Sequence, residues 1–96
     1  MSVYVVVQLE MHNREIYDRY QSNFFDVFIK YKGKLLASDE KPKVVEGSWD
    51  MDKVVIMNFP DSESFMNWAN SPEYLKISED RKAGATATVL LVESFE

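Results

Sequence analysis

The sequence contains no cysteine, one histidine, three glycines and three prolines among its 96 residues. Without cysteine the chain forms no disulfide and carries out no thiol chemistry. One histidine and no cysteine also leave too few ligands for a tetrahedral zinc site within one chain. There is no glycine-rich phosphate-binding loop, which leaves nucleotide binding without support. We therefore expect neither a metal nor a bound cofactor.

Positive charge is scarce as well, because 11 lysines and arginines face 16 acidic residues and give a net charge of −5. Nucleic-acid binding and docking on anionic lipid both need a clustered basic surface. No apolar run approaches the roughly 18 residues that span a bilayer, and no basic-then-apolar signal stands at the N-terminus. These absences predict a cytoplasmic protein with neither nucleic acid nor a membrane as its partner.

Hydrophobic residues make up 46% of the sequence and aromatic residues 14%, which is typical of a globular protein. The length predicts a single domain over residues 1–96. A domain of this size buries only a modest fraction of its surface, so self-association would help to stabilise it.

Two runs, residues 3–9 and 54–59, consist of strand-favouring residues that are apolar on both faces. Such runs are typical of strands in the middle of a sheet. Lysines and a proline mark an edge strand made of residues 34–38 and 42–46, interrupted at residues 39–41. A fourth strand is expected over residues 86–92.

Helical periodicity follows Asn13, the expected N-cap of a helix that ends near Lys32, with Gly33 at its C′ position. Asp61 and Ser71 are further N-caps. They predict a short helix over residues 61–70 and a second helical piece from Pro72 to about Arg81.

The predicted order is β-α-β-β-α-β, the order of a ferredoxin-like α+β fold with a four-stranded antiparallel sheet (4-1-3-2) and helices on one face. The face turned away from the helices would also be largely apolar. We therefore expect a homodimer joined sheet to sheet. The residues of this far face are Tyr4, Val6, Gln8, Val54, Ile56, Asn58, Thr88, Leu90 and Val92.

Eight segments, in order along the whole chain, carry a resemblance to a known family. They are Tyr31–Lys34, Val45–Trp49, Val54–Ile56, Phe59–Pro60, Trp68, Asn70–Tyr74, Arg81 and Val89–Glu93. In these segments the chain resembles the uncharacterised bacterial domain of unknown function 1330 family, of the dimeric α/β-barrel superfamily. The resemblance implies a ferredoxin-like fold paired through its sheets. The superfamily includes cofactor-free monooxygenases, lactone isomerases and heme-handling proteins, but the family itself has no assigned reaction.

Arg81 is the foremost candidate for chemistry, because it shares an inward helix face with Tyr74 and Ile77. It is either a guanidinium that grips a carboxylate or enolate oxygen, an ion-pair partner of Glu46, or a helix-end contact. Glu46 is either a general base or a structural partner. His12 is a proton shuttle, an axial heme ligand or a solvated loop residue.

Trp49 and Trp68 either wall an apolar pocket or belong to the core. Tyr74 and Ser71 would donate to a ligand oxygen, unless Ser71 serves only as a cap.

Two functions remain open. One is a homodimer that binds a small apolar or anionic molecule in a cleft between sheet and helices, with cofactor-free proton-transfer or monooxygenase-type chemistry. The alternative is a non-catalytic dimeric binding or scaffold domain.

Overall fold

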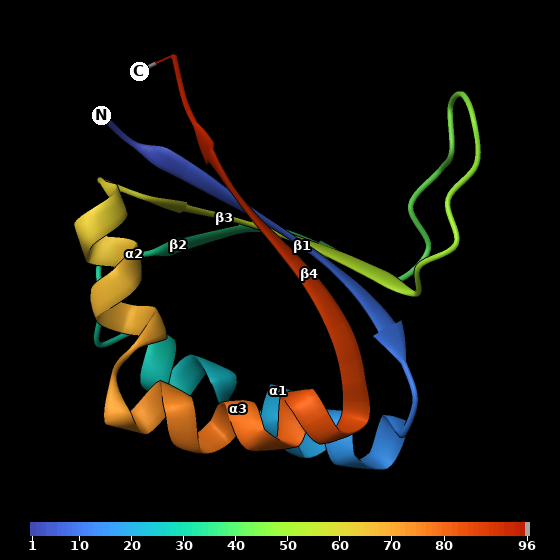
Figure 1. Ribbon diagram of the computed structural model, residues 1–96, viewed down its shortest axis with the longest axis horizontal. Helices are drawn as coiled ribbons and strands as arrows, with labels where there is room; N and C mark the ends of the chain where they lie inside the picture. Colours follow the sequence, from blue (N-terminus) through green and yellow to red (C-terminus); the bar gives the residue numbers. More distant parts are fainter. Residues whose placement is uncertain (96) are drawn as a thin grey trace.

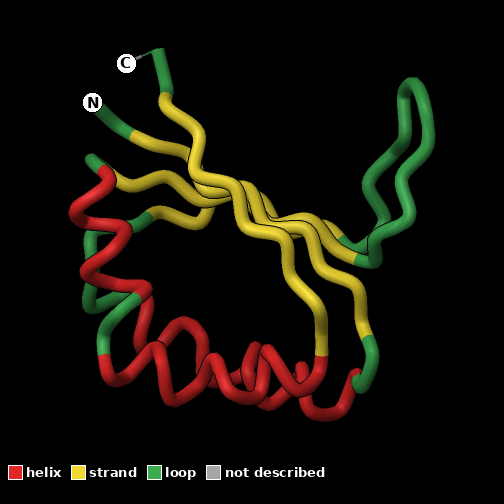
Figure 2. The backbone as a smooth tube through the Cα atoms, viewed as in Figure 1, coloured by secondary structure: helices red, strands yellow, loops and turns green. Residues whose placement is uncertain are grey.

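The computed structural model describes residues 1–95 as one four-stranded antiparallel sheet with three helices on one side of it (Figures 1 and 2). The strand order β2-β3-β1-β4 is the predicted order read from the other edge, so the ferredoxin-like α+β fold is confirmed. None of the helices in residues 1–95 has the length and apolarity that a bilayer crossing requires. The elements are β1 (Val3–Met11), α1 (Arg14–Phe28), β2 (Lys34–Asp39), β3 (Lys53–Phe59), α2 (Ser62–Ala69), α3 (Pro72–Gly84) and β4 (Ala85–Glu93).

The strand pleat decides which residues of β1 face the helices. Alternate side chains, Val3, Val5, Val7 and Leu9, are buried, while the residues between them are half-buried. Antiparallel pairing places Met57 of β3 and Leu91 of β4 on either side of Val5. Because side chains alternate across a strand, these neighbours share the face that the helices cover.

Aromatic side chains from three elements fill one end of the space between the two layers. The Trp68 ring of α2 lies 5.3 Å from the Phe28 ring of α1 and 5.6 Å from the Phe59 ring of β3, measured between centroids. Offset and edge-on ring pairs of this kind stabilise a core beyond the area they bury. The cluster fixes α2 against both the sheet and α1.

Helix α1 begins as predicted, since the side chain of Asn13 accepts a hydrogen bond from the Ile16 backbone N–H at 3.2 Å. It ends at Phe28 rather than near Lys32, so the predicted C-terminus is wrong. Gly33 does not adopt a positive φ. A Cβ on Gly33 would instead lie 2.6 Å from the Phe59 ring, so the glycine provides space rather than a left-handed cap.

The other two helices confirm their predicted caps. Asp61 accepts from the Ser64 N–H at 2.7 Å, and Ser71 accepts from the Tyr74 N–H at 3.1 Å, with proline in the first turn of α3. Helix α3 runs on past Arg81 to Gly84, whose carbonyl oxygen accepts from the backbone N–H groups of His12 and Asn13 at 2.8 and 3.0 Å. The end of α3 thereby holds the start of α1.

Only part of the predicted edge strand is in the sheet. Strand β2 pairs with β3 from Lys34 to Asp39, with a bulge between Leu35 and Ala37, and residues 42–46 belong to no strand. Proline at position 42 offers no N–H to continue the ladder. The chain instead forms a long loop, residues 40–52, that extends past the sheet on the side away from the helices (Figure 2). Gly47 in this loop has a φ of 86°, a backbone conformation that glycine adopts without a steric penalty.

Candidate functional site

A cavity of about 460 Å³ lies between the helices and the side of the sheet that faces them. Its size is within the range of roughly 300 to 1,000 Å³ found for small-molecule sites. More than half of the residues in its wall are apolar or aromatic, and the others carry a polar or charged group. The polar members are Tyr17, Tyr20, Gln21, Ser38, Lys53, Asn70, Tyr74, Ser78, Arg81 and Lys82.

Two N–H groups in the cavity wall are buried without a hydrogen-bond acceptor among the described residues. They are the indole Nε1 of Trp68 and the Nε of Arg81. The side chain of Trp68 is almost fully buried, with 3% of its surface exposed. A buried donor without an acceptor costs about 1 to 3 kcal/mol. The folded protein therefore contains two destabilising, unsatisfied N–H donors in the wall of one cavity.

The phenols of Tyr20 and Tyr74 meet in the same wall, with their hydroxyl oxygens 3.0 Å apart. Burial, and then the neighbouring Tyr74, raise the pKa of Tyr20 far above its ordinary value of 10.0. Tyr20 is therefore a neutral phenol near pH 7. A pair of hydroxyls needs only one hydrogen for its mutual bond, so the second O–H remains able to donate to a ligand oxygen.

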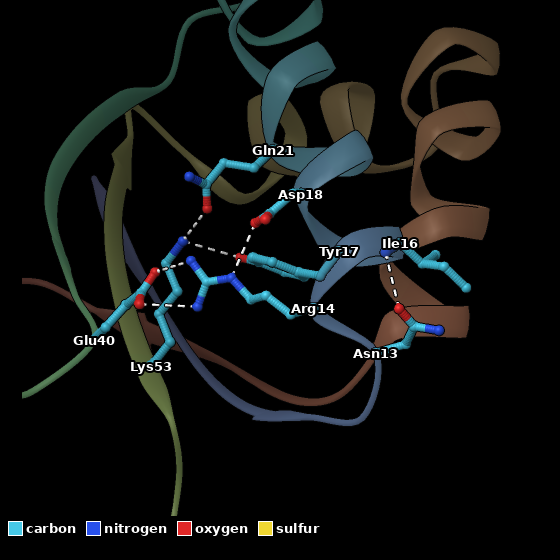
Figure 3. A network of polar contacts seen from close by, with 8 residues as sticks. All are labelled: Asn13, Arg14, Ile16, Tyr17, Asp18, Gln21, Glu40 and Lys53. Atoms are coloured by element: carbon cyan, nitrogen blue, oxygen red, sulfur yellow. Dashed lines mark hydrogen bonds and ion pairs between the residues drawn. The ribbon is translucent and has the colours of Figure 1, made fainter.

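Lys53 is the buried cation of the cavity, with 5% of its surface exposed. Its Nζ donates to the Tyr17 hydroxyl at 3.1 Å and to Gln21 Oε1 at 2.6 Å (Figure 3). The same nitrogen lies 4.9 Å from the centre of the Tyr17 ring. Burial lowers the pKa of Lys53, because it disfavours the charged ammonium.

The carboxylates near Lys53 are held by another cation. Arg14 donates to both oxygens of Glu40, at 2.9 and 2.6 Å, and to Asp18 at 3.0 Å (Figure 3). The hydrogen bonds to Arg14 lower the pKa of Glu40. Burial raises the pKa of Tyr17 to about 12, so its phenol supplies no negative charge at neutral pH.

Lys53 and its neighbours were not predicted from the sequence, although one signal was present. Lys53 stands two residues before Val55 and four before Met57, on the face of β3 that otherwise turns apolar side chains to the helices. A lysine at a core-facing position of an apolar strand is unusual. Tyr17 and Gln21 lie four residues apart and therefore share one face of α1.

Three of the predicted ligand-binding residues, Trp68, Tyr74 and Arg81, come together in the cavity wall. Ser71 does not line it. Its hydroxyl accepts from the Tyr74 N–H and donates to the Trp68 carbonyl at 2.8 Å, so both of its functions are used within the helix cap. In the structure Ser71 positions Trp68 and Tyr74 instead of facing a ligand.

Trp49 and Glu46 lie on the opposite side of the sheet. The indole of Trp49 donates to Gln8 Oε1 at 3.0 Å, and both residues line a shallow hollow with Val54 and the 42–48 segment. Of the alternatives that the sequence left open for Arg81, the ion pair with Glu46 is excluded, because the sheet separates the two side chains. No carboxylate in residues 1–95 forms an ion pair with Arg81.

His12 lies in the connection between β1 and α1 and is exposed. Its Nε2 is 2.6 Å from the Thr86 hydroxyl and 3.7 Å from a Glu10 carboxylate oxygen. It does not belong to the cavity wall. Neither proton acceptor suggested by the sequence, Glu46 or His12, thus reaches the site that contains Arg81.

The four-stranded antiparallel sheet with its helices on one side defines a ferredoxin-like α+β protein. The chain belongs to the family described as Domain of unknown function (DUF1330), which it matches over residues 2–95. The resemblance seen in the sequence is thereby confirmed. The sequence shows no significant similarity to any curated protein.

Solved structures share this fold at low sequence identity. A protein of unknown function from Rhodopseudomonas palustris superposes with a TM-score of 0.83 at 16% identity, covering 99% of this chain and 83% of that one. SnoaB, a cofactor-independent oxygenase from Streptomyces nogalater, has a TM-score of 0.72 at 16% identity and covers 99% and 94%. A dimeric ferredoxin-like protein of unknown function from Bacteroides fragilis has a TM-score of 0.72 at 10% identity and covers 97% and 96%.

Proposed function

We propose that this protein binds a small, largely apolar molecule with one anionic or enolisable oxygen in the cavity between sheet and helices. The observation that carries the proposal is the pair of unpartnered N–H groups, Trp68 Nε1 and Arg81 Nε, in an apolar wall. Acceptor atoms of a bound ligand would take the hydrogen bonds that the chain leaves unmade. The apolar wall would bury the remainder of the ligand.

The charge of Arg81 favours an anionic oxygen over a neutral one. Its guanidinium is always protonated and is not neutralised by a carboxylate of residues 1–95. In a site that excludes water, such a cation stabilises negative charge that develops on a ligand oxygen. Proton removal from a carbonyl or phenolic compound would develop charge of this kind.

Cofactor-free proton transfer or monooxygenase-type chemistry is the reaction class we propose for such a ligand. The fold likeness to SnoaB, described as a cofactor-independent oxygenase, supports this class. Oxygen uptake measured with and without an electron-rich phenol tests it. Uptake that requires the protein and falls in Arg81→Met supports an oxygenase, and its absence leaves ligand binding without oxygenation.

The working unit in this proposal is a homodimer joined through the far faces of two sheets. On β4, Leu90 and Val92 have 46% and 44% of their surfaces exposed, and this strand forms an edge of the far face. The B. fragilis structure is described as dimeric. Sedimentation of Leu90→Asp at micromolar concentration tests the interface. We expect a monomer, and a wild-type protein that itself sediments as a monomer would refute the dimer.

The fluorescent probe 1-anilinonaphthalene-8-sulfonate tests the binding site, because it joins an aromatic body to one anionic group. We expect wild-type protein to bind it and Arg81→Met to bind it about ten to a hundred times more weakly. That factor corresponds to a charged hydrogen bond of about 1.5 to 3 kcal/mol. Lys76→Met is the matched control, since Lys76 is an exposed residue of the same helix and outside the cavity wall.

Equal affinity in Arg81→Met and Lys76→Met would contradict the proposal. The alternative, a non-catalytic dimeric scaffold, predicts no saturable binding of the probe to the folded protein. Near-ultraviolet circular dichroism of each variant establishes that the tertiary structure is retained. Substitution of Trp49 by phenylalanine leaves Trp68 as the one tryptophan, so that its emission reports binding in the cavity directly.

A further inference from the structure

The Nζ atom of Lys53 is presented to the cavity by neutral groups alone. Its hydrogen-bond partners are the phenol of Tyr17 and the side-chain amide of Gln21, and the Tyr17 ring lies beneath it. Burial is unusual for lysine, which is almost never fully buried unless it is paired. Lys53 forms no ion pair with any carboxylate of residues 1–95.

Two carboxylates lie near the Lys53 amine, but neither forms a hydrogen bond with it. Both Glu40 and Asp18 are hydrogen-bonded to Arg14 (Figure 3). Burial lowers the pKa of Lys53 most, Glu40 and Asp18 raise it, and the positive charge of Arg14 opposes these carboxylates. The Tyr17 phenol remains protonated at neutral pH. A desolvated amine beside a cation and without a counterion is the setting in which lysines act as nucleophiles.

We infer that Lys53 is the nucleophile of a covalent carbonyl-binding site, which forms an imine with small apolar aldehydes or ketones that enter the cavity. The inference rests on the proposed function to the extent that the cavity must admit a ligand. It goes further by assigning a covalent step, a residue and a substrate class. It also assigns a role to the buried lysine, whereas an anion-binding site around Arg81 assigns it none.

The step proceeds through a tetrahedral adduct. Lys53 first loses its ammonium proton to water, which leaves the neutral amine. The lone pair of Nζ then forms a bond to the carbonyl carbon, and the carbonyl π electrons move to oxygen, which takes up one proton from the amine. The hydroxyl then leaves as water with a proton from Tyr17, whose oxygen is 3.1 Å from Nζ. The resulting protonated imine returns a proton to Tyr17. The balance is amine plus carbonyl compound to imine plus water, with no oxidant or reductant consumed.

Reductive trapping tests this assignment on the intact protein. Wild-type protein is incubated at pH 7 with benzaldehyde and sodium cyanoborohydride, which reduces the imine to a stable secondary amine, and the benzylated lysine is located by peptide mass spectrometry. We expect the label on Lys53 in excess over the exposed Lys76. We also expect loss of that label in Lys53→Met and its retention in Lys76→Met. Lys76 is the matched control, because it is exposed and lies outside the cavity wall.

A label spread evenly over the lysines, or found on Lys82 in place of Lys53, would overturn the inference. The mapping of wild-type protein gives this answer even if Lys53→Met folds poorly. Titration with the sulfonate probe separates this inference from the proposed function. Binding that depends on Arg81, together with an unlabelled Lys53, refutes the imine and retains the anion site. Selective labelling of Lys53, without any effect of Arg81→Met on binding of the probe, retains the imine and refutes the anion site.

Discussion

Replacement of Arg81 by methionine distinguishes two possible roles of this arginine, stabilisation of the fold and binding of a ligand. Arg81 has a buried Nε with no acceptor among residues 1–95 and no ion-pair partner there. Methionine keeps most of the aliphatic stem and removes the polar group. The substitution therefore relieves a buried unsatisfied donor, which costs about 1 to 3 kcal/mol. Some packing around the guanidinium is lost in return.

We expect the free energy of unfolding of Arg81→Met to be unchanged or higher by up to about 2 kcal/mol, since the relieved donor outweighs the lost packing. In a domain of this length each kcal/mol moves the melting temperature by about 4 to 8 °C. Urea denaturation followed by circular dichroism measures the change, with all variants at one protein concentration because dimerisation would couple to stability.

Lys30→Met serves as the control for loss of one surface cation. Its Nζ bonds Glu73 at 2.6 Å, and both side chains are substantially exposed. An exposed ion pair contributes about 0 to 1 kcal/mol, so a loss within this range is expected. A fall of more than about 1 kcal/mol in Arg81→Met would show that the guanidinium stabilises the fold. That result would refute the reasoning that connects its unpartnered nitrogen to a ligand.

Three further predictions concern the framework around the cavity. Gly84→Ala should lower stability by about 1 to 3 kcal/mol in chemical denaturation, because its Cβ would lie 2.7 Å from the Tyr17 backbone nitrogen and 2.9 Å from the Asn13 carbonyl oxygen. Asn13→Ala should cost about 1 kcal/mol through the lost cap of α1, whereas Asn13→Ser should restore most of it. For Lys53, whose folded pKa lies below the ordinary value of 10.5, the unfolded chain binds more protons between these two values. Wild-type protein should therefore gain stability relative to Lys53→Met as the pH rises through that window, and a flat difference would contradict the lowered pKa.

The architecture could be predicted from the sequence because strand and helix periodicities are local. The apolar runs of β1 and β3 identify central strands, and the caps at Asp61 and Ser71 place two helix starts correctly. The wrong predictions concern positions at which a tertiary contact determines the local structure. Gly33 was interpreted as a left-handed cap, but the reason for glycine there is the Phe59 ring on a distant strand.

The candidate site could be predicted only in part, because its residues come from elements far apart in the chain. Helical spacing was enough to direct Tyr74 and Arg81 inward together. Nothing in the sequence shows that the loop holding Glu46 and Trp49 lies on the other face of the sheet, since a long loop carries no periodicity to fix its direction. Lys53 was overlooked because its hydrogen-bond partner Tyr17 is 36 positions away.

The sequence by itself determined the order of elements, the faces of the central strands and the family, because each depends on patterns between near neighbours in the chain. Only the tertiary structure decided which polar groups lack a partner. That property arises only when β3, α1, α2 and α3 pack around one cavity. In this packing the buried N–H groups of Arg81 and Trp68 have no acceptor among residues 1–95, and Lys53 has no carboxylate there as a counterion.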